Sequence, residues 1–236
     1  MEIPPQHRKI VGVICALILL GWIGWFFYRC GRAPEGPPYS NWGMDFNIGW
    51  VLSKETQRVV GKTINAVILL PVRENKNGVA PEKMAYQQLD GFMAGLFDDQ
   101  GNPLRDAKIL GKKYRSDATM DVYTWPQISV ITAVAQEYPS CNAIISFAGP
   151  PTVMPNESGT FDPSRLPRLF VFSAPVLMPD RWQGWFAPGL MEVLITAKPG
   201  SPQPTETKSA HAFVEQAYYI IRKENVGEMA HQALTR

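Results

Sequence analysis

Residues 64–70 read INAVILL, a continuous apolar run that ends at Pro71. A short apolar run of this kind indicates a strand that is buried on both faces, as in a parallel sheet. The next segment, 81–97, carries apolar residues at helical spacing. Gly91 and Gly95 lie four residues apart in this segment, so we expect the helix backbone to approach the sheet closely. Strand and helix together predict the first half of a β-α-β unit.

The same alternation of strands and helices continues along the chain. Further strands are predicted at 107–114, 142–147, 168–173 and 191–197, and helices at about 124–138, at 179–188 and from 208 onward. Strands that alternate with helices imply right-handed crossovers. The sequence therefore predicts an α/β fold with one doubly wound, mostly parallel, Rossmann-like sheet of about five strands. Residues 50–60 are compatible with either a short helix or a strand.

The most apolar stretch of the chain is 10–28, nineteen residues without a charge. As a helix it would be about 28 Å long, close to the hydrocarbon thickness of a bilayer. Its second half is rich in Trp, Phe and Tyr, which prefer the headgroup region. Bulky aromatics and Arg29 stand where a signal-peptide cleavage site has small residues. We therefore expect an uncleaved N-terminal transmembrane helix.

This anchor divides the chain into four predicted parts. They are a cytoplasmic tail (1–9), the transmembrane helix (10–28), a Pro/Gly-rich linker (29–49) and an extracytoplasmic α/β domain (50–236). Basic residues flank both ends of the anchor, so the charge bias is slight. A short tail before a large domain usually stays in the cytoplasm, which would place the domain outside, in the periplasm if the source is bacterial.

The charge balance excludes one class of partner. Outside the first 30 residues the chain has 20 basic and 20 acidic residues. A nucleic-acid binder needs a basic surplus to displace counterions from phosphates. We therefore expect no nucleic-acid partner, and we expect the lipid bilayer as a partner through the anchor.

Several motifs carry a resemblance to a known family. An apolar strand (NAVILLP) precedes a helix with internal glycines (YQQLDGFMAGLF), a loop with Asp and Gln (YRSDATMDVYTWPQ) and a further strand (CNAIISFAG). This stretch, 65–148, resembles the N-terminal lobe of type I periplasmic binding proteins, the receptors of sugar and amino-acid uptake systems. The segment AFVEQAYYIIRKEN, 212–225, is similar to the closing segment of some of these receptors. A full receptor has two lobes, so the resemblance implies a single receptor-like lobe.

Ligands of open α/β sheets bind beyond the carboxyl ends of the strands. The loops predicted there carry carboxylate and guanidinium groups, which bond hydroxyls, and an indole, which covers a sugar ring. The candidates are Arg73, Asn75, Asp117, Asp121, Asp180, Arg181 and Trp182. The alternative is that these are the polar residues that populate any such loops.

The sequence offers no catalytic constellation, metal site or cofactor motif. Only His211 and His231 follow the anchor, and they lie twenty residues apart, without an HExxH pairing. A Gly-x-Ser-x-Gly elbow is also missing. These features favour a non-enzymatic protein with no cofactor and no metal.

Two functions remain. The first is a membrane-anchored interaction module or subunit of a cell-envelope complex, which binds another protein or forms a homo-oligomer. Its contact candidates are Trp182, Trp185 and Phe186 in the segment 178–190, because Trp, Phe and Arg favour interface centres. The alternative is that Trp185 and Phe186 cover the sheet. The second function is a receptor for a small, sugar-like ligand at the strand-end loops.

Overall fold

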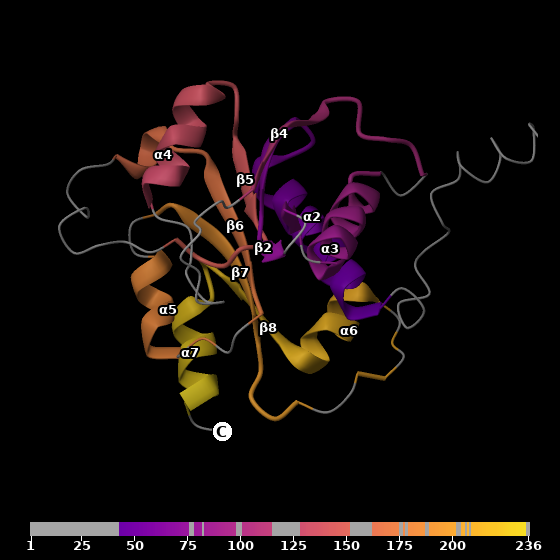
Figure 1. The fold of residues 1–236 in the computed structure, drawn as a ribbon. Helices are drawn as coiled ribbons and strands as arrows, with labels where there is room; N and C mark the ends of the chain where they lie inside the picture. The colour runs from indigo at the N-terminus through magenta and orange to yellow at the C-terminus, as the bar shows by residue number, and fades with distance from the viewer. Residues whose placement is uncertain are drawn as a thin grey trace, which may run out of the picture.

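The structure is a computed structural model of the chain. The residues that the structure describes are 43–75, 78–81, 83–97, 101–114, 128–151, 162–174, 177, 179–186, 189–201, 204–205, 207 and 209–234. They form one six-stranded sheet with helices on both faces and one small two-stranded sheet (Figure 1).

The five strands that the sequence predicts are present. They are β1 (Ile64–Leu70), β4 (Ala107–Tyr114), β5 (Ala143–Ser146), β6 (Arg168–Ser173) and β7 (Met191–Ala197). They pair in parallel in the order β4-β1-β5-β6-β7. All residues of β1 except Asn65 are buried, because both faces of the strand are covered. The predicted α/β class with a mostly parallel sheet is confirmed.

A sixth strand, β8 (Tyr218–Arg222), pairs antiparallel with β7 at the edge of the sheet. The sequence pattern predicts one continuous helix from 208 onward, and this prediction is wrong. Helix α6 (Ala210–Ala217) begins after Ser209 and is followed at once by the strand. Residues 219–221 are all buried, which suits a strand between two covered faces and does not suit a helix with one exposed side.

Helices cover both faces of the sheet (Figure 1). One face carries α2 (Gly43–Val60), α3 (Lys83–Gly95) and α6, and the other carries α4 (Ile128–Glu137), α5 (Pro179–Phe186) and α7 (Val226–Leu234). Side chains along each strand alternate between the two faces. Ile68 of β1 therefore joins the core under α2 and α3, whereas Val67 joins the core under α4 and α5.

Helix α2 corrects the predicted linker boundary. Residues 43–49 are predicted as the end of the linker, but they form the first turns of α2, and 50–60 complete the same helix. The residues that suggested a linker are packing positions, since Asn47 and Gly49 are fully buried or nearly so. A buried glycine in a helix indicates that another backbone comes close.

Helices α2 and α3 meet backbone to backbone. A Cβ atom added to Gly49 would lie 1.8 Å from the main-chain oxygen of Gln88, and one added to Gly91 would lie 1.9 Å from that of Phe46. Glycine is needed at both positions because no side chain fits. We expected Gly91 and Gly95 to approach the sheet, but they approach α2 instead.

The loop predicted at 71–79 contains the small second sheet. Strand β2 (Val72–Asn75) pairs antiparallel with β3 (Gly78–Pro81). A two-residue connection is typical of a hairpin. This hairpin leads from the end of β1 to the start of α3. The described part of the long loop between β5 and β6 includes one turn of 3-10 helix, Pro163–Arg165.

No helix among the described residues is long and apolar enough to cross a bilayer. The predicted tail (1–9), the predicted transmembrane helix (10–28) and the predicted linker up to residue 42 lie outside the described residues. The anchor therefore stays a prediction.

Candidate functional site

The carboxyl ends of the five parallel strands lie along one edge of the sheet, which we call the carboxyl edge. Strand β1 has β4 on one side and β5 on the other, and the chain visits β4 before it crosses to β5. Open α/β sheets leave a ligand crevice where the strand order reverses in this way. The two strands stay paired up to this point, since the amide of Phe147 donates a hydrogen bond of 2.9 Å to the oxygen of Leu69.

The fold brings several predicted ligand residues to this edge. Arg73 and Asn75 lie on β2, directly after the end of β1. Asp180 is exposed in the first turn of α5, the helix that follows β6, and Arg181 is the next residue of that helix. Two further candidates, Asp117 and Asp121, lie outside the described residues.

Three buried hydroxyl residues stand at or next to the carboxyl ends of β5, β6 and β7. Ser146, Ser173 and Thr196 are each at most 1% exposed. The Ser146 hydroxyl donates a 2.7 Å hydrogen bond to the oxygen of Gly149, and the Thr196 hydroxyl accepts one of 3.3 Å from the amide of Leu177. Buried polar groups need such partners. The hydroxyls of Ser146 and Thr196 therefore fix the backbone of the edge loops, a role that was not predicted from the sequence.

Trp182 is a core residue. Its side chain is 1% exposed, and its indole NH donates a 3.2 Å hydrogen bond to the oxygen of Leu177. Its ring packs edge-on against Tyr219, with 5.3 Å between the ring centroids. A side chain that is covered on all sides has no surface to offer a ligand or a partner. Its prediction as a ligand and contact residue is therefore corrected.

Phe186 and Trp185 pack against the sheet and do not form an exposed contact surface, which is the alternative given for them in the sequence analysis. Phe186 is 4% exposed and belongs to the core under α5. Trp185 is half-buried and packs against the same core. Helix α5 turns its aromatic side toward the sheet, so the segment 178–190 is not the exposed aromatic patch that the sequence suggested.

Lys198 follows β7 at the carboxyl edge and was not among the predicted residues. Its ammonium group lies 5.1 Å from the centre of the Tyr219 ring, over its face. The same group donates a hydrogen bond to the main-chain oxygen of Glu215. The contact between a cation and the face of an aromatic ring is favourable. The ammonium group itself stays at the surface, while the aliphatic part of the side chain can pack. Lys198 is thus a cation that its contacts hold in place at this edge.

A half-buried carboxylate, that of Asp45, also lies near the carboxyl edge. It is on the face of the sheet that α2, α3 and α6 cover. The Asp45 side chain, in the first turn of α2, accepts a 2.8 Å hydrogen bond from the side-chain amide nitrogen of Gln88. Burial raises the pKa of Asp45 above its usual value, although the bond from Gln88 acts in the other direction. Burial, together with the charge of Asp45, also raises the pKa of Tyr218. Tyr218 pairs with Ala197, the last residue of β7, which places this polar group at the carboxyl edge.

The carboxylates of Asp45 and Asp180 and the ammonium group of Lys198 suit hydrogen bonding to a polar ligand. Carboxylates accept bonds from ligand hydroxyls, and a lysine ammonium donates them. Within the described part of the chain, no three His, Cys, Asp or Glu side chains are placed to hold a metal ion together.

A second polar cluster lies at the opposite, amino edge of the sheet. The Glu55 side chain on α2 is 3% exposed. It accepts bonds of 2.6 and 3.0 Å from the Arg222 guanidinium of β8, 2.8 Å from Arg58 and 3.1 Å from the His211 ring nitrogen. Burial alone would raise the pKa of Glu55, but these three partners lower it far below its usual value. The cluster ties α2 to α6 and β8, which is a structural role.

Comparisons with known proteins were made by sequence and by structure. No protein-family model matches the chain, and no curated protein matches its sequence. The similar solved structures include sugar-binding proteins of transporters. Three of them are an arabinose-binding protein from Geobacillus stearothermophilus (10% identity, TM-score 0.46), a solute-binding protein from Agrobacterium vitis bound to tagatopyranose (16%, 0.45) and one from Actinobacillus succinogenes bound to allose (14%, 0.43).

These solved structures are solute-binding proteins, the class that the sequence resembles. Each solved chain is longer than the part of it that aligns with this chain. The alignments cover 78% or 79% of this chain but only 59% to 62% of the three solved chains. The chain thus spans about three fifths of the length of each.

Proposed function

We propose that the protein is a non-enzymatic, single-lobed receptor that binds a small, hydroxyl-rich ligand of the sugar class at its carboxyl edge. The observation that supports this most is the switch point between β1 and β5, because an open α/β sheet has its natural ligand crevice there. The hairpin β2–β3 and the start of α5 flank this edge and carry Arg73, Asn75 and Asp180.

The chemistry of the edge supports a neutral, polar ligand. Asp180 offers an exposed carboxylate, Asp45 a half-buried one, and Lys198 a cation. Groups of both signs at one edge suit a ligand that both donates and accepts hydrogen bonds, as a sugar does. The interaction module through segment 178–190 has less support, because the rings of Trp182 and Phe186 are used in the core.

Binding is testable by thermal unfolding of the full chain in mild detergent. We expect one sugar of a panel that begins with arabinose, allose and tagatose to raise the unfolding midpoint. A ligand at 100 times its dissociation constant stabilises the folded state by about 2.7 kcal/mol. We expect Asp180→Asn to raise the dissociation constant for this sugar at least tenfold, because a ligand hydroxyl loses a charged acceptor. The sugar should then stabilise the variant less at the same concentration.

The matched control is Asp106→Asn. Asp106 is also exposed, but it directly precedes β4 at the amino edge, so the change should leave the ligand effect intact. A panel without any stabilising sugar contradicts the receptor proposal. Equal effects of the two substitutions contradict the placement of the site.

We also propose that residues 10–28 anchor the chain in a bilayer, with the α/β domain outside the cytoplasm. The support is the uncharged run of nineteen residues with its aromatic end. We expect the full chain to stay with the membrane fraction after a carbonate wash. Leu19→Arg combined with Leu20→Arg should release it, because each arginine costs about 2.5–3.5 kcal/mol at the centre of a span.

The control for this experiment is Leu234→Arg. Leu234 is 65% exposed at the end of α7, so its replacement should leave the membrane fraction unchanged. A mature chain that begins near residue 30 by mass spectrometry contradicts the anchor.

A further inference from the structure

Exposed apolar side chains gather on one helix. Three of the five large hydrophobic residues that are well exposed in the described part of the chain belong to α3: Met84, Tyr86 and Met93 are 47%, 46% and 42% exposed. Figure 1 shows α3 on the outer side of its helical layer. Single exposed apolar residues are ordinary, but several on one helix indicate a contact surface.

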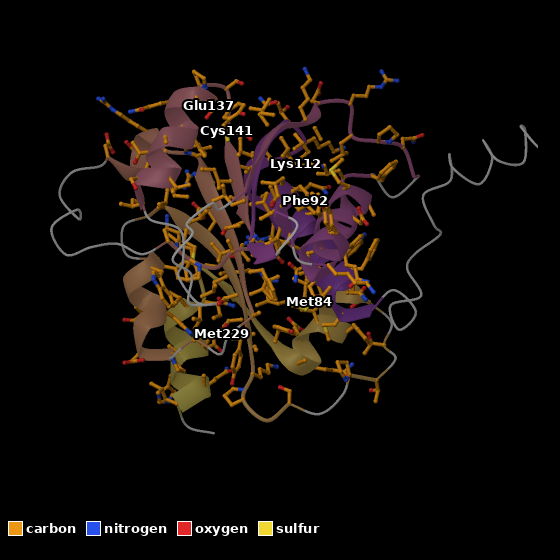
Figure 2. All side chains as sticks on the ribbon, in the orientation of Figure 1. Met84, Phe92, Lys112, Glu137, Cys141 and Met229 are labelled. Carbon is orange, nitrogen blue, oxygen red and sulfur yellow. The ribbon has the colours of Figure 1, made fainter. Side chains whose placement is uncertain are left out.

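Two of these residues share one side of the helix with two charges. Lys83, Tyr86, Asp90 and Met93 recur at spacings of three and four residues, which places them on one face. All four are exposed, and we call them the outer face of α3. The opposite side of the helix carries Phe92, which is fully buried; Phe92 and Met84 are labelled in Figure 2.

This face is held rigidly. Gly91 packs against the backbone of α2, and Gly95 against Ser53 of the same helix, so α3 cannot shift without moving α2. The buried side chains of both helices belong to one core. A fixed face presents the same residues at all times, so little order has to be created when a partner binds.

The charges on the outer face are self-complementary. Lys83 and Asp90 lie seven residues apart, about 10 Å along the helix, with Tyr86 between them. When two copies pair antiparallel about a twofold axis near Tyr86, Lys83 of each copy faces Asp90 of the other. A parallel pairing would place each lysine beside the other lysine, which is unfavourable.

We infer that the outer face of α3 is the contact of a symmetric, antiparallel dimer of this chain. A twofold axis uses the same patch on both copies, which is the arrangement that a face with one cation, one anion and a central aromatic ring allows. One helix face is smaller than the ~800 Å² per partner of a standard interface. We therefore expect a weak dimer, with a dissociation constant on the order of 10–100 μM.

The test is sedimentation velocity of the full chain in mild detergent over a concentration series. We expect the dimer fraction to rise with concentration. Lys83→Glu should weaken the dimer at least tenfold, because it creates two acid–acid contacts, and Asp90→Lys should do the same with two base–base contacts. Combining the two substitutions should restore dimerisation, since each opposite-charge contact re-forms with its signs exchanged.

The variants are chosen to keep the fold. A glutamate in the first turn of α3 suits the helix dipole, and Lys83 and Asp90 are both exposed. The control is Lys62→Glu, which reverses an exposed charge in the turn after α2 and should leave the dimer unchanged.

Three outcomes overturn the inference. The first is a chain that stays monomeric at every concentration. The second is a dimer that Lys83→Glu leaves intact, which would mean that another segment forms the contact. The third is a combined variant that stays monomeric. None of these results depends on whether the carboxyl edge binds a sugar.

Discussion

Gly49→Ala is expected to destabilise the fold by about 3 kcal/mol or more. The added Cβ would lie 1.8 Å from the main-chain oxygen of Gln88 and 2.8 Å from the amide nitrogen of Phe92. Both are backbone atoms of α3, so the overlap is relieved only when the helices separate. Overpacking of flexible side chains already costs about 1–3 kcal/mol, and a backbone clash is harder to relieve. Urea unfolding followed by circular dichroism measures the change.

Gly184→Ala is the matched control. Gly184 is also inside a helix, α5, but a Cβ added there has no atom within 4 Å. Because alanine is the better helix former, this change should be neutral or stabilising by up to about 1 kcal/mol. Equal unfolding midpoints for Gly49→Ala and the unchanged chain contradict the close contact between α2 and α3.

Glu55→Gln is expected to lower stability by about 3 kcal/mol. The amide keeps the size of the side chain but removes the charge that faces Arg222, Arg58 and His211 at the amino edge. Breaking a buried ion pair on one side typically costs 3–5 kcal/mol, because the remaining charge loses its partner. Glu224→Gln is the control: Glu224 is 57% exposed and pairs with Arg58, so its loss should cost under about 1 kcal/mol.

The effect of Glu55→Gln should depend on pH. The partners of Glu55 lower the pKa of its carboxyl in the folded chain below the usual value of 4.5. The unfolded chain therefore takes up a proton first as the pH falls, and the stability that Glu55 supplies is present above about pH 4.5 and declines below it. The difference between the two proteins should shrink between about pH 5 and pH 2. A difference that stays constant over this range contradicts a lowered pKa.

The parallel strands were predictable because burial on both faces forces a simple pattern. Runs such as INAVILL and RLFVFS have polar residues only at or next to their ends, and the structure begins and ends these strands at the expected residues. Strand β8 escaped prediction because no glycine or proline separates it from α6. Its apolar residues also fit a helical period, and only the packing against β7 decides for a strand.

The first turns of helix α2, residues 43–49, escaped prediction for a different physical reason. Glycine at 43 and 49 suggested a linker, since glycine weakens an isolated helix. In the folded chain Gly49 is needed for the contact with α3, and the free energy of that packing outweighs the low propensity. Sequence periodicity carries no information about which second backbone approaches a glycine.

The position of some candidate residues in the fold was predictable, but their contacts were not. A residue that follows a parallel strand lies at its carboxyl end whatever the order of the strands, so Arg73 and Asp180 could be assigned to the carboxyl edge. Asp45 could not, because residues 43–49 were predicted as linker. Lys198 follows a predicted strand, but its contact with Tyr219 was not predictable, because that ring belongs to the unforeseen β8. The bond between Glu55 and Arg222 joins residues 167 positions apart, and no local pattern reveals such a pair.

The direction of α2 has a consequence for how the ligand would arrive. Asp45, in the first turn, lies near Tyr218 at the carboxyl edge, so the polypeptide enters the fold on the side of the proposed crevice. Fourteen residues, 29–42, separate that entry point from the end of the predicted anchor, a reach of at most about 50 Å. If residues 10–28 lie in a bilayer as proposed, the proposed crevice would stay within about 50 Å of the lipid surface, and its ligand would come from the aqueous layer of that depth.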